Sequence, residues 1–133
     1  MKRGVLADAG PLYAAVDPTD SQHQRAIREL QELARRQFDI VISFSTLLES
    51  YSLVLHKLGR QVAFRWLGEM ADAVLVNPGP EDYRQAIGKV TGFADQSITL
   101  FDAIVAVLSA QMGLRVWTYD HHFDVMQVPV WRG

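Results

Sequence analysis

Acidic residues stand at positions where carboxylates from distant parts of the chain can meet. Asp8 and Asp120 each follow a short apolar segment typical of a buried strand, and Glu49 lies in the first turn expected for the helix after another such segment. If these strands run parallel, the three side chains project from the same edge of the sheet. Asp102 begins a helix that follows a polar loop, 91–97, so spacing alone does not place it at this edge.

Such a cluster predicts a metal site. Carboxylates crowded at one edge repel one another and raise one another's pKa values unless a cation neutralises them. The chain contains no cysteine, so a metal would bind through oxygen or imidazole nitrogen. A hard cation that prefers oxygen ligands, Mg²⁺ or Mn²⁺, is the natural partner of converging carboxylates.

Each acid also has a purely structural explanation. Thr46 with Glu49, and Thr99 with Asp102, have the spacing of a capping box, in which an acid near a helix start accepts a backbone N–H group. An aspartate after a strand is a common turn residue. The convergence of several acids favours a functional role over these separate local ones.

The elements that must position these acids alternate along the chain. Apolar runs predict buried strands at 5–7, 40–42, 73–76 and 115–118, and a short edge strand at 128–131. Helices are predicted from Pro11, over 21–37, from 47 to a stop near Gly59, and over 60–70, 81–90 and 100–112. This alternation predicts an α/β fold, a three-layer α/β/α sandwich with a central, mostly parallel sheet of four to five strands.

The length, apolar runs and net charge of the chain favour a single-domain cytoplasmic protein. A chain of 133 residues without a linker predicts one domain over 1–133. We expect a cytoplasmic protein, because the start is too short for a signal peptide and no apolar run approaches the roughly 18 residues of a membrane span. The net charge of −2 excludes binding of nucleic acid through bulk positive charge. Any nucleic acid would therefore be met by a local patch.

The histidines and arginines favour surface roles. The adjacent His121 and His122 cannot both point the same way on a regular element and lack the helical spacing of a zinc site, so we expect both at the surface. Several arginines follow the helix predicted over 21–37 and are interpreted as a solvated face; they are Arg25, Arg28, Arg35 and Arg36.

Four ordered motifs give the sequence a family resemblance. They read Asp8-Ala9-Gly10-Pro11-Leu12, Ser45-Thr46-Leu47-Leu48-Glu49, Phe101-Asp102-Ala103-Ile104-Val105-Ala106 and Thr118-Tyr119-Asp120-His121-His122-Phe123. In order and interval they resemble the acidic motifs of PIN-domain nucleases, including the VapC-type toxins of toxin–antitoxin systems. The resemblance implies cleavage of RNA that depends on Mg²⁺ or Mn²⁺, a homodimer and an antitoxin partner.

The resemblance also assigns residues. Asp8, Glu49 and Asp102 match the three core acids as catalytic residues and metal ligands, and Asp120 matches the more variable fourth acid. Further candidates are auxiliary: Thr118 at a frequent hydroxyl position, and the nearby acids Asp95 and Asp124. The last motif often has Asp directly before its Phe, where this sequence has His122.

A homodimer also agrees with the residues of two predicted helices. The segments 47–58 and 60–70 carry apolar side chains on more than one face, namely Tyr51, Leu55, Phe64, Trp66 and Leu67. Apolar area left exposed in one patch generally marks an interface.

Two other functions remain as alternatives. A PIN-like module that has lost catalysis would serve as an RNA or protein scaffold, although Asp8, Glu49 and Asp102 are intact. A phosphoaspartate phosphatase or receiver domain also places an Asp after the first strand. The phosphatase would need a second Asp where Gly10 stands, and the receiver would need further acids and a late lysine that this chain lacks.

Overall fold

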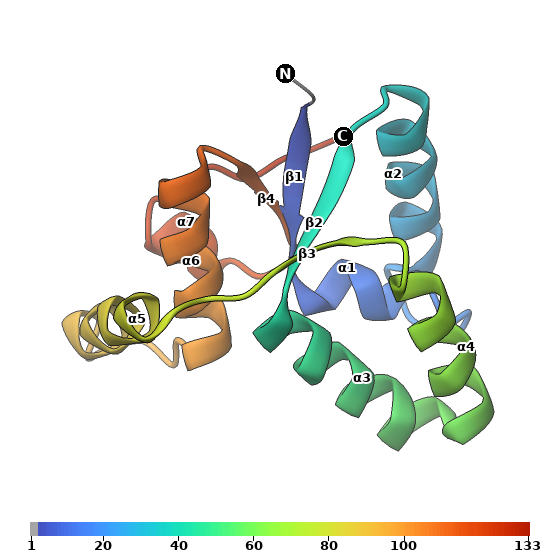
Figure 1. Cartoon of the computed structure of the whole chain (residues 1–133), viewed down its shortest axis with the longest axis horizontal. Helices are drawn as coiled ribbons and strands as arrows, with labels where there is room; N and C mark the ends of the chain where they lie inside the picture. The colour runs from blue at the N-terminus through green and yellow to red at the C-terminus, as the bar shows by residue number, and fades with distance from the viewer. Residues whose placement is uncertain (1–2) are drawn as a thin grey trace.

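The computed structural model of the chain describes residues 3–133 as an α/β fold of three layers (Figure 1). Its parallel sheet has the strand order β3-β2-β1-β4. The strands are β1 (Gly4–Ala7), β2 (Asp39–Ser43), β3 (Val74–Val76) and β4 (Arg115–Trp117). The helices are α1 (Ala9–Ala14), α2 (His23–Arg35), α3 (Phe44–Leu58), α4 (Arg60–Met70), α5 (Pro80–Gly92), α6 (Leu100–Met112) and α7 (His122–Val125). The predicted fold class is confirmed, with four strands in the sheet.

Alternating side chains of the central strand separate two cores. Leu6 lies in one core with residues of α5, α6 and α7, whereas Val5 and Ala7 lie in the other with residues of α1 and α2. Because successive side chains of a strand point to opposite faces, a strand covered on both faces must be apolar throughout. All three of these side chains are fully buried, which explains the uninterrupted apolar run before Asp8.

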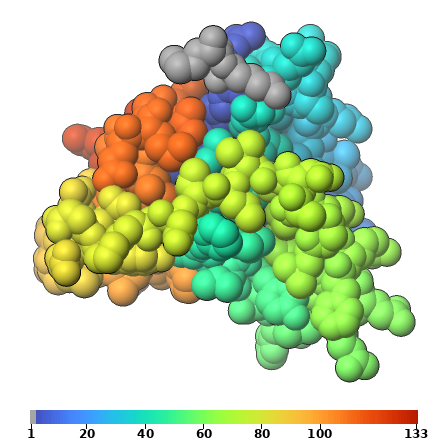
Figure 2. Space-filling model, viewed as in Figure 1, coloured from blue at the N-terminus to red at the C-terminus, as the bar shows by residue number. Residues whose placement is uncertain are grey.

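The helical layers lie on opposite sides of the sheet. In Figure 1, α5, α6 and α7 lie on one side, and α1, α2 and α4 lie on the other. The space-filling view shows α5 on the outer flank and the segment of β3 crossing the near face between the two layers (Figure 2). A third core joins α1, α3 and α4 through Tyr13, Val54, Ala63 and Trp66.

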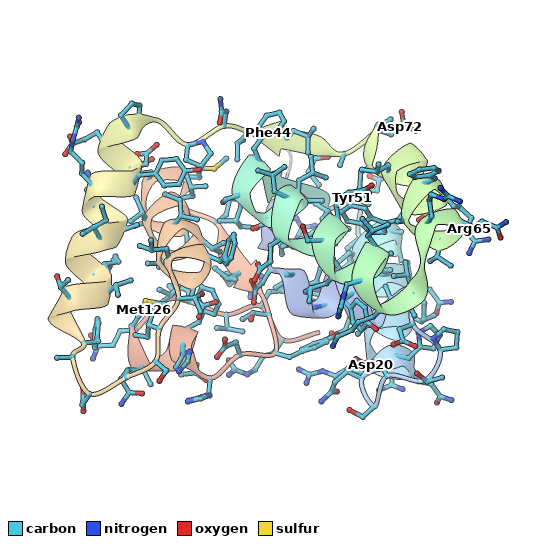
Figure 3. All side chains as sticks on the ribbon, turned by 90° about the horizontal axis from the view of Figure 1, so that it is seen from below. Asp20, Phe44, Tyr51, Arg65, Asp72 and Met126 are labelled. Carbon is cyan, nitrogen blue, oxygen red and sulfur yellow. The ribbon has the colours of Figure 1, made fainter. Side chains whose placement is uncertain are left out.

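The direction of the strands decides where a site can form. All of them run the same way, so their carboxyl ends lie at one edge, from which α1 and α3 also start. Figure 3 is seen from below relative to Figure 1 and looks onto this edge, with Phe44 and Tyr51 marking α3. Ligands of such parallel sheets bind at the carboxyl edge.

The predicted edge strand at 128–131 is wrong. Val130 forms only an isolated parallel bridge with Val116, in which Val116 N–H donates to Pro129 O and Trp131 N–H donates to Val116 O. On the amino-terminal side of this bridge the parallel ladder would continue through an N–H group on Pro129, which proline lacks. The segment therefore runs beside β4 without becoming a strand.

Several helix bounds also differ from the prediction; α1, for example, begins at Ala9 and not at Pro11. Helix α3 begins at Phe44 and not at 47, because Ser43 caps it by accepting a hydrogen bond from Thr46 N–H at 3.2 Å. Helix α7 was not predicted, because its four residues are too few to show a helical period. Among residues 3–133, no helix is long and apolar enough to cross a membrane.

Candidate active site

Asp8 lies at the carboxyl end of β1, between the strand and α1. Its backbone N–H donates to Trp117 O at 2.9 Å, which extends the pairing of β1 with β4 by one residue. Asp8 is 6% exposed, and its Oδ2 accepts a hydrogen bond from Thr118 Oγ1 at 2.8 Å. Thr118 is also buried, so the auxiliary hydroxyl named in the sequence analysis contacts an acid of the cluster.

Glu49 lies on α3 one turn further along than predicted. Because the helix begins at Phe44, Glu49 is in its second turn, and the capping box expected for Thr46 and Glu49 is wrong. Ser43 caps the helix instead. Within the described chain the Glu49 carboxylate accepts no hydrogen bond, which leaves it available to a ligand.

Asp102 reaches the site through the start of α6. Its backbone N–H donates to Thr99 Oγ1 at 3.1 Å, and its Oδ2 accepts from Thr99 N–H at 3.4 Å, so the second predicted capping box is confirmed. The residue is 6% exposed. Helix α6 packs against α3, which brings its amino end to the edge that the sequence alone did not assign.

Asp120 is held by a chain of short-range hydrogen bonds after β4. Its backbone N–H donates to Thr118 Oγ1 at 3.0 Å, and its Oδ1 accepts from His122 N–H at 2.9 Å. Thr118 Oγ1 therefore links Asp8 and Asp120 by donating to one and accepting from the other. The side chain of Asp120 is about one-third exposed.

The four carboxylates lie near enough to one another to interact electrostatically. Burial raises the pKa of Asp8 to about 6, and the charges of Asp102 and Asp120 add to this effect against hydrogen bonds from Thr118 and the Ala9 amide. Burial, followed by repulsion from the other three acids, raises the pKa of Glu49 to about 7. Burial and then the charge of Asp120 raise the pKa of Asp102.

The positive charge of the protein does not balance this cluster. Over residues 3–133, no lysine or arginine forms a salt bridge with Asp8, Glu49, Asp102 or Asp120. Mutual repulsion of this kind is relieved by a bound cation. The donor set, carboxylate oxygens from four elements, fits the ligand preference of Mg²⁺ or Mn²⁺.

His122 joins the cluster, and the surface role expected for it is wrong. Its side chain is 15% exposed, and its Nδ1 lies 3.4 Å from Asp102 Oδ2 and 3.3 Å from Asp120 Oδ1. His121 is the exposed member of the pair, with a side chain 76% exposed. Only the folding of α7 decides which of the two adjacent rings turns inward.

The remaining auxiliary candidates lie outside the cluster. Asp95 is exposed in the turn between α5 and α6, and it makes no hydrogen bond or ion pair with any other described residue. Asp124 is exposed on α7 and pairs with Arg132, whose Nη2 lies 3.1 Å from Asp124 Oδ2. Neither side chain contacts the four clustered acids.

A buried carboxylate on α2 supports the segment that carries Thr118 and Asp120. Glu29 Oε1 accepts hydrogen bonds from Trp117 Nε1 at 3.0 Å and from Tyr119 Oη at 2.5 Å, and Glu29 is 8% exposed. Glu29 was not predicted as a buried residue, because it lies on a polar face of α2 that is typical of solvent exposure. Arg25 stacks on the Tyr119 ring at 4.2 Å and so is also part of this contact.

The fold and site define a parallel α/β domain with an acidic centre at the carboxyl edge of its sheet. The PIN domain family model matches residues 5–128 of the sequence. The chain therefore belongs to the PIN domain family, as its motifs predict, and the phosphoaspartate alternatives are set aside. A search of curated proteins finds no significant match.

Solved structures from three bacteria share the fold. VapC20 of Mycobacterium tuberculosis, described as a toxin that cleaves the sarcin–ricin loop, has a TM-score of 0.84 at 16% identity, over 98% of this chain and 100% of that one. FitAcB from Neisseria gonorrhoeae has a TM-score of 0.70 at 19% identity, over 96% of each chain. VapBC2 from Rickettsia felis, bound to a DNA fragment from its promoter, has a TM-score of 0.73 at 13% identity, also over 96% of each chain.

Proposed function

We propose that this PIN-domain protein is a metal-dependent endoribonuclease that hydrolyses phosphodiester bonds of RNA with Mg²⁺ or Mn²⁺. The observation that carries the proposal is the convergence of Asp8, Glu49, Asp102 and Asp120 without a neutralising lysine or arginine among residues 3–133. In this proposal all four are catalytic residues and ligands of the cation. When bound, the cation supplies positive charge that offsets the charge developing on the phosphate oxygens.

The acids of the cluster have different roles in the proposed reaction. Asp8 and Asp102 are buried and fixed by hydrogen bonds from Thr118 and Thr99, so they hold their positions at the site. Glu49 is half-buried, and its carboxylate accepts no hydrogen bond from residues 3–133, so it is the acid of the cluster that is free to take a proton from the attacking water. In hydrolysis the water oxygen bonds to phosphorus, the bond to the leaving ribose oxygen breaks, and that oxygen receives a proton.

A cleavage assay tests this proposal. Asp8→Asn and Asp102→Asn keep the side-chain shape and remove the charge, so each should reduce cleavage of a mixed RNA pool with Mg²⁺ or Mn²⁺ by at least about a hundredfold, a loss of about 3 kcal/mol. Asp95→Asn is the matched control, because Asp95 is exposed outside the cluster. Full activity of either cluster variant would refute the assignment.

We further propose that the protein is the toxin of a toxin–antitoxin pair. The proposal is supported by family membership and by the fold shared with VapC20, FitAcB and VapBC2. An antitoxin would restrain the enzyme by offering a basic side chain to the acidic cluster, and arginine suits this role through its bidentate geometry. Expression should arrest growth, and co-expression of the neighbouring gene product should relieve the arrest. If that product neither binds nor relieves it, the toxin proposal fails and the ribonuclease proposal stands.

A homodimer is the proposed quaternary state. Exposed apolar side chains on α3 and α4 support it: Leu48 is 65% exposed, Phe64 is 56% exposed, and Leu55 and Leu67 are each more than one-third exposed. Trp66 does not contribute as expected, because it is buried in the core between α3 and α4. Light scattering at micromolar concentration should give twice the mass of the chain. A monomer would contradict this proposal.

A further inference from the structure

The site contains a nitrogen donor as well as carboxylates. His122 is the first residue of α7, and the residues before and after it in the chain hold its ring at the cluster. Its backbone N–H donates to Asp120 Oδ1, and the next residue, Phe123, is fully buried in the core beneath α6. The His122 side chain is therefore fixed at the cluster by folding and does not reach it from a mobile loop.

The distances around His122 Nδ1 are longer than good hydrogen bonds. The contacts to Asp120 Oδ1 and Asp102 Oδ2 are 3.3 and 3.4 Å, whereas nitrogen–oxygen hydrogen bonds cluster near about 2.9 Å. Ligand atoms that share one cation at about 2.1 Å lie about 3.0 Å apart in octahedral sites and about 3.4 Å apart in tetrahedral sites. The imidazole nitrogen is thus spaced from each of the two carboxylate oxygens like a neighbouring ligand of one ion, and His122 and Asp120 belong, with His121, to a group whose possible ligand atoms lie within 4.8 Å of one another.

The oxygen atoms retain capacity for such an ion. Asp120 Oδ1 accepts the His122 N–H, and Asp102 Oδ2 accepts the Thr99 N–H at the long distance of 3.4 Å. A carboxylate oxygen has two lone pairs, so each of the two atoms keeps one for a cation. A neutral imidazole offers the lone pair of its unprotonated nitrogen in the same way.

We propose that His122 Nδ1 is a ligand of the site's cation together with Asp102 and Asp120, and that this nitrogen makes the site prefer Mn²⁺ to Mg²⁺. The inference rests on the proposed function in that a divalent cation binds at the four acids. Imidazole is a good ligand for first-row transition metals, whereas Mg²⁺ favours oxygen ligands and retained water. The selectivity of the centre is therefore set by a residue outside the four acids.

His121 supplies a matched control. It is the same residue type at the adjacent position, and its Nδ1 lies 3.7 Å from Asp120 Oδ1, but its side chain is 76% exposed. Replacement of His121 therefore removes an imidazole near the cluster without removing the buried one. His122→Asn removes the proposed nitrogen ligand, and His122→Asp replaces it with an oxygen ligand.

The test measures metal binding to the metal-free protein, independently of cleavage. Pulsed EPR of the Mn²⁺-loaded wild type should show the strong nitrogen hyperfine coupling of a bound imidazole, and calorimetry should give tighter binding of Mn²⁺ than of Mg²⁺. His122→Asn should lose the coupling and weaken Mn²⁺ binding about 10- to 100-fold, with a smaller loss for Mg²⁺. His121→Asn should match the wild type, and His122→Asp should lose the coupling but bind Mg²⁺ more tightly than His122→Asn does.

Several outcomes would overturn the inference. Absence of the coupling in the wild type, its persistence in His122→Asn, or its loss in His121→Asn would each exclude His122 as the ligand. Equal losses of Mn²⁺ and Mg²⁺ binding in a folded His122→Asn protein would exclude the selectivity. If the wild type binds Mn²⁺ and Asp102→Asn does not, but the bound Mn²⁺ shows no nitrogen coupling, this inference alone is overturned. If the wild type binds neither metal, the proposed function is overturned as well.

Discussion

The buried carboxylate of Asp8 should destabilise the metal-free protein at neutral pH. Its pKa rises from an ordinary value of 3.8 to about 6, chiefly through burial, so between these values the folded state binds more protons than the unfolded state. The free energy of unfolding then falls as pH rises through this range. Glu49, with its pKa raised from 4.5 to about 7, acts in the same direction over a slightly higher range.

The size of the effect follows from linkage. Raising the pKa of Asp8 from 3.8 to about 6 lowers the free energy of unfolding by about 3 kcal/mol where Asp8 is ionised in both states. This destabilisation is fully present above pH 7 and falls to about 1 kcal/mol near pH 4.5. Asp8→Asn removes the charge and keeps an oxygen that can accept the Thr118 hydrogen bond. The variant should therefore be more stable than the wild type by about 3 kcal/mol at pH 7.5, which corresponds to a rise in Tm of about 10 °C.

Urea unfolding in the presence of EDTA is the assay, followed by tryptophan fluorescence because Trp117 and Trp131 are buried. Other acids have pKa values that folding lowers, so they make the protein more stable as pH rises; these are Asp17, Glu32 and Asp82. Their contribution is the same in variant and wild type, so the difference in free energy of unfolding between the two proteins at each pH isolates the effect of Asp8. Asp95→Asn should change stability little at any pH. The reasoning is refuted if Asp8→Asn is no more stable than the wild type at pH 7.5, or if its advantage does not shrink toward pH 4.5.

Two further predictions concern the cation and the support of the site. Millimolar Mg²⁺ or Mn²⁺ should raise the Tm of the wild type but not that of Asp8→Asn, as measured by scanning calorimetry. At a metal concentration of a hundred times Kd, the free energy of unfolding should rise by about 2.7 kcal/mol. An equal rise in Tm of both proteins would mean that the metal binds elsewhere. Glu29→Ala should cost about 2 kcal/mol in urea unfolding, because it leaves the buried Trp117 N–H without its acceptor. Glu32→Ala on the same helix breaks only surface ion pairs and should cost less than about 1 kcal/mol; equal costs would contradict the role of Glu29.

The strands and most helices follow from local patterns that tertiary structure did not override. The apolar run before Asp8 predicts a strand because a central strand of this sheet is covered on both faces and needs apolar side chains in both directions. The stop of α6 at Gly113 is equally local, since this residue has a positive φ of 66° that glycine adopts without strain. The edge strand at 128–131 fails because its apolar pattern does not reveal which bonds Pro129 would have to donate.

The sequence by itself determined the acids and their order along the chain, because each stands in a motif that can be read without coordinates. It also determined the capping box of Asp102, which depends only on residues three apart. Whether an acid points into a shared site depends on the helix register, and Glu49 is an example: the cap at Ser43 moves it into the second turn and frees its carboxylate.

Only the tertiary structure decided which polar side chains are buried together. Asp102 reaches the edge because α6 packs against α3, His122 turns inward because Phe123 anchors α7 in the core, and Glu29 is buried because α2 packs over the end of β4. None of these contacts has a local signature, since each joins segments that are 20 or more residues apart. The physical reason is that burial of a polar group depends on the partners that folding brings to it, and those partners lie elsewhere in the chain.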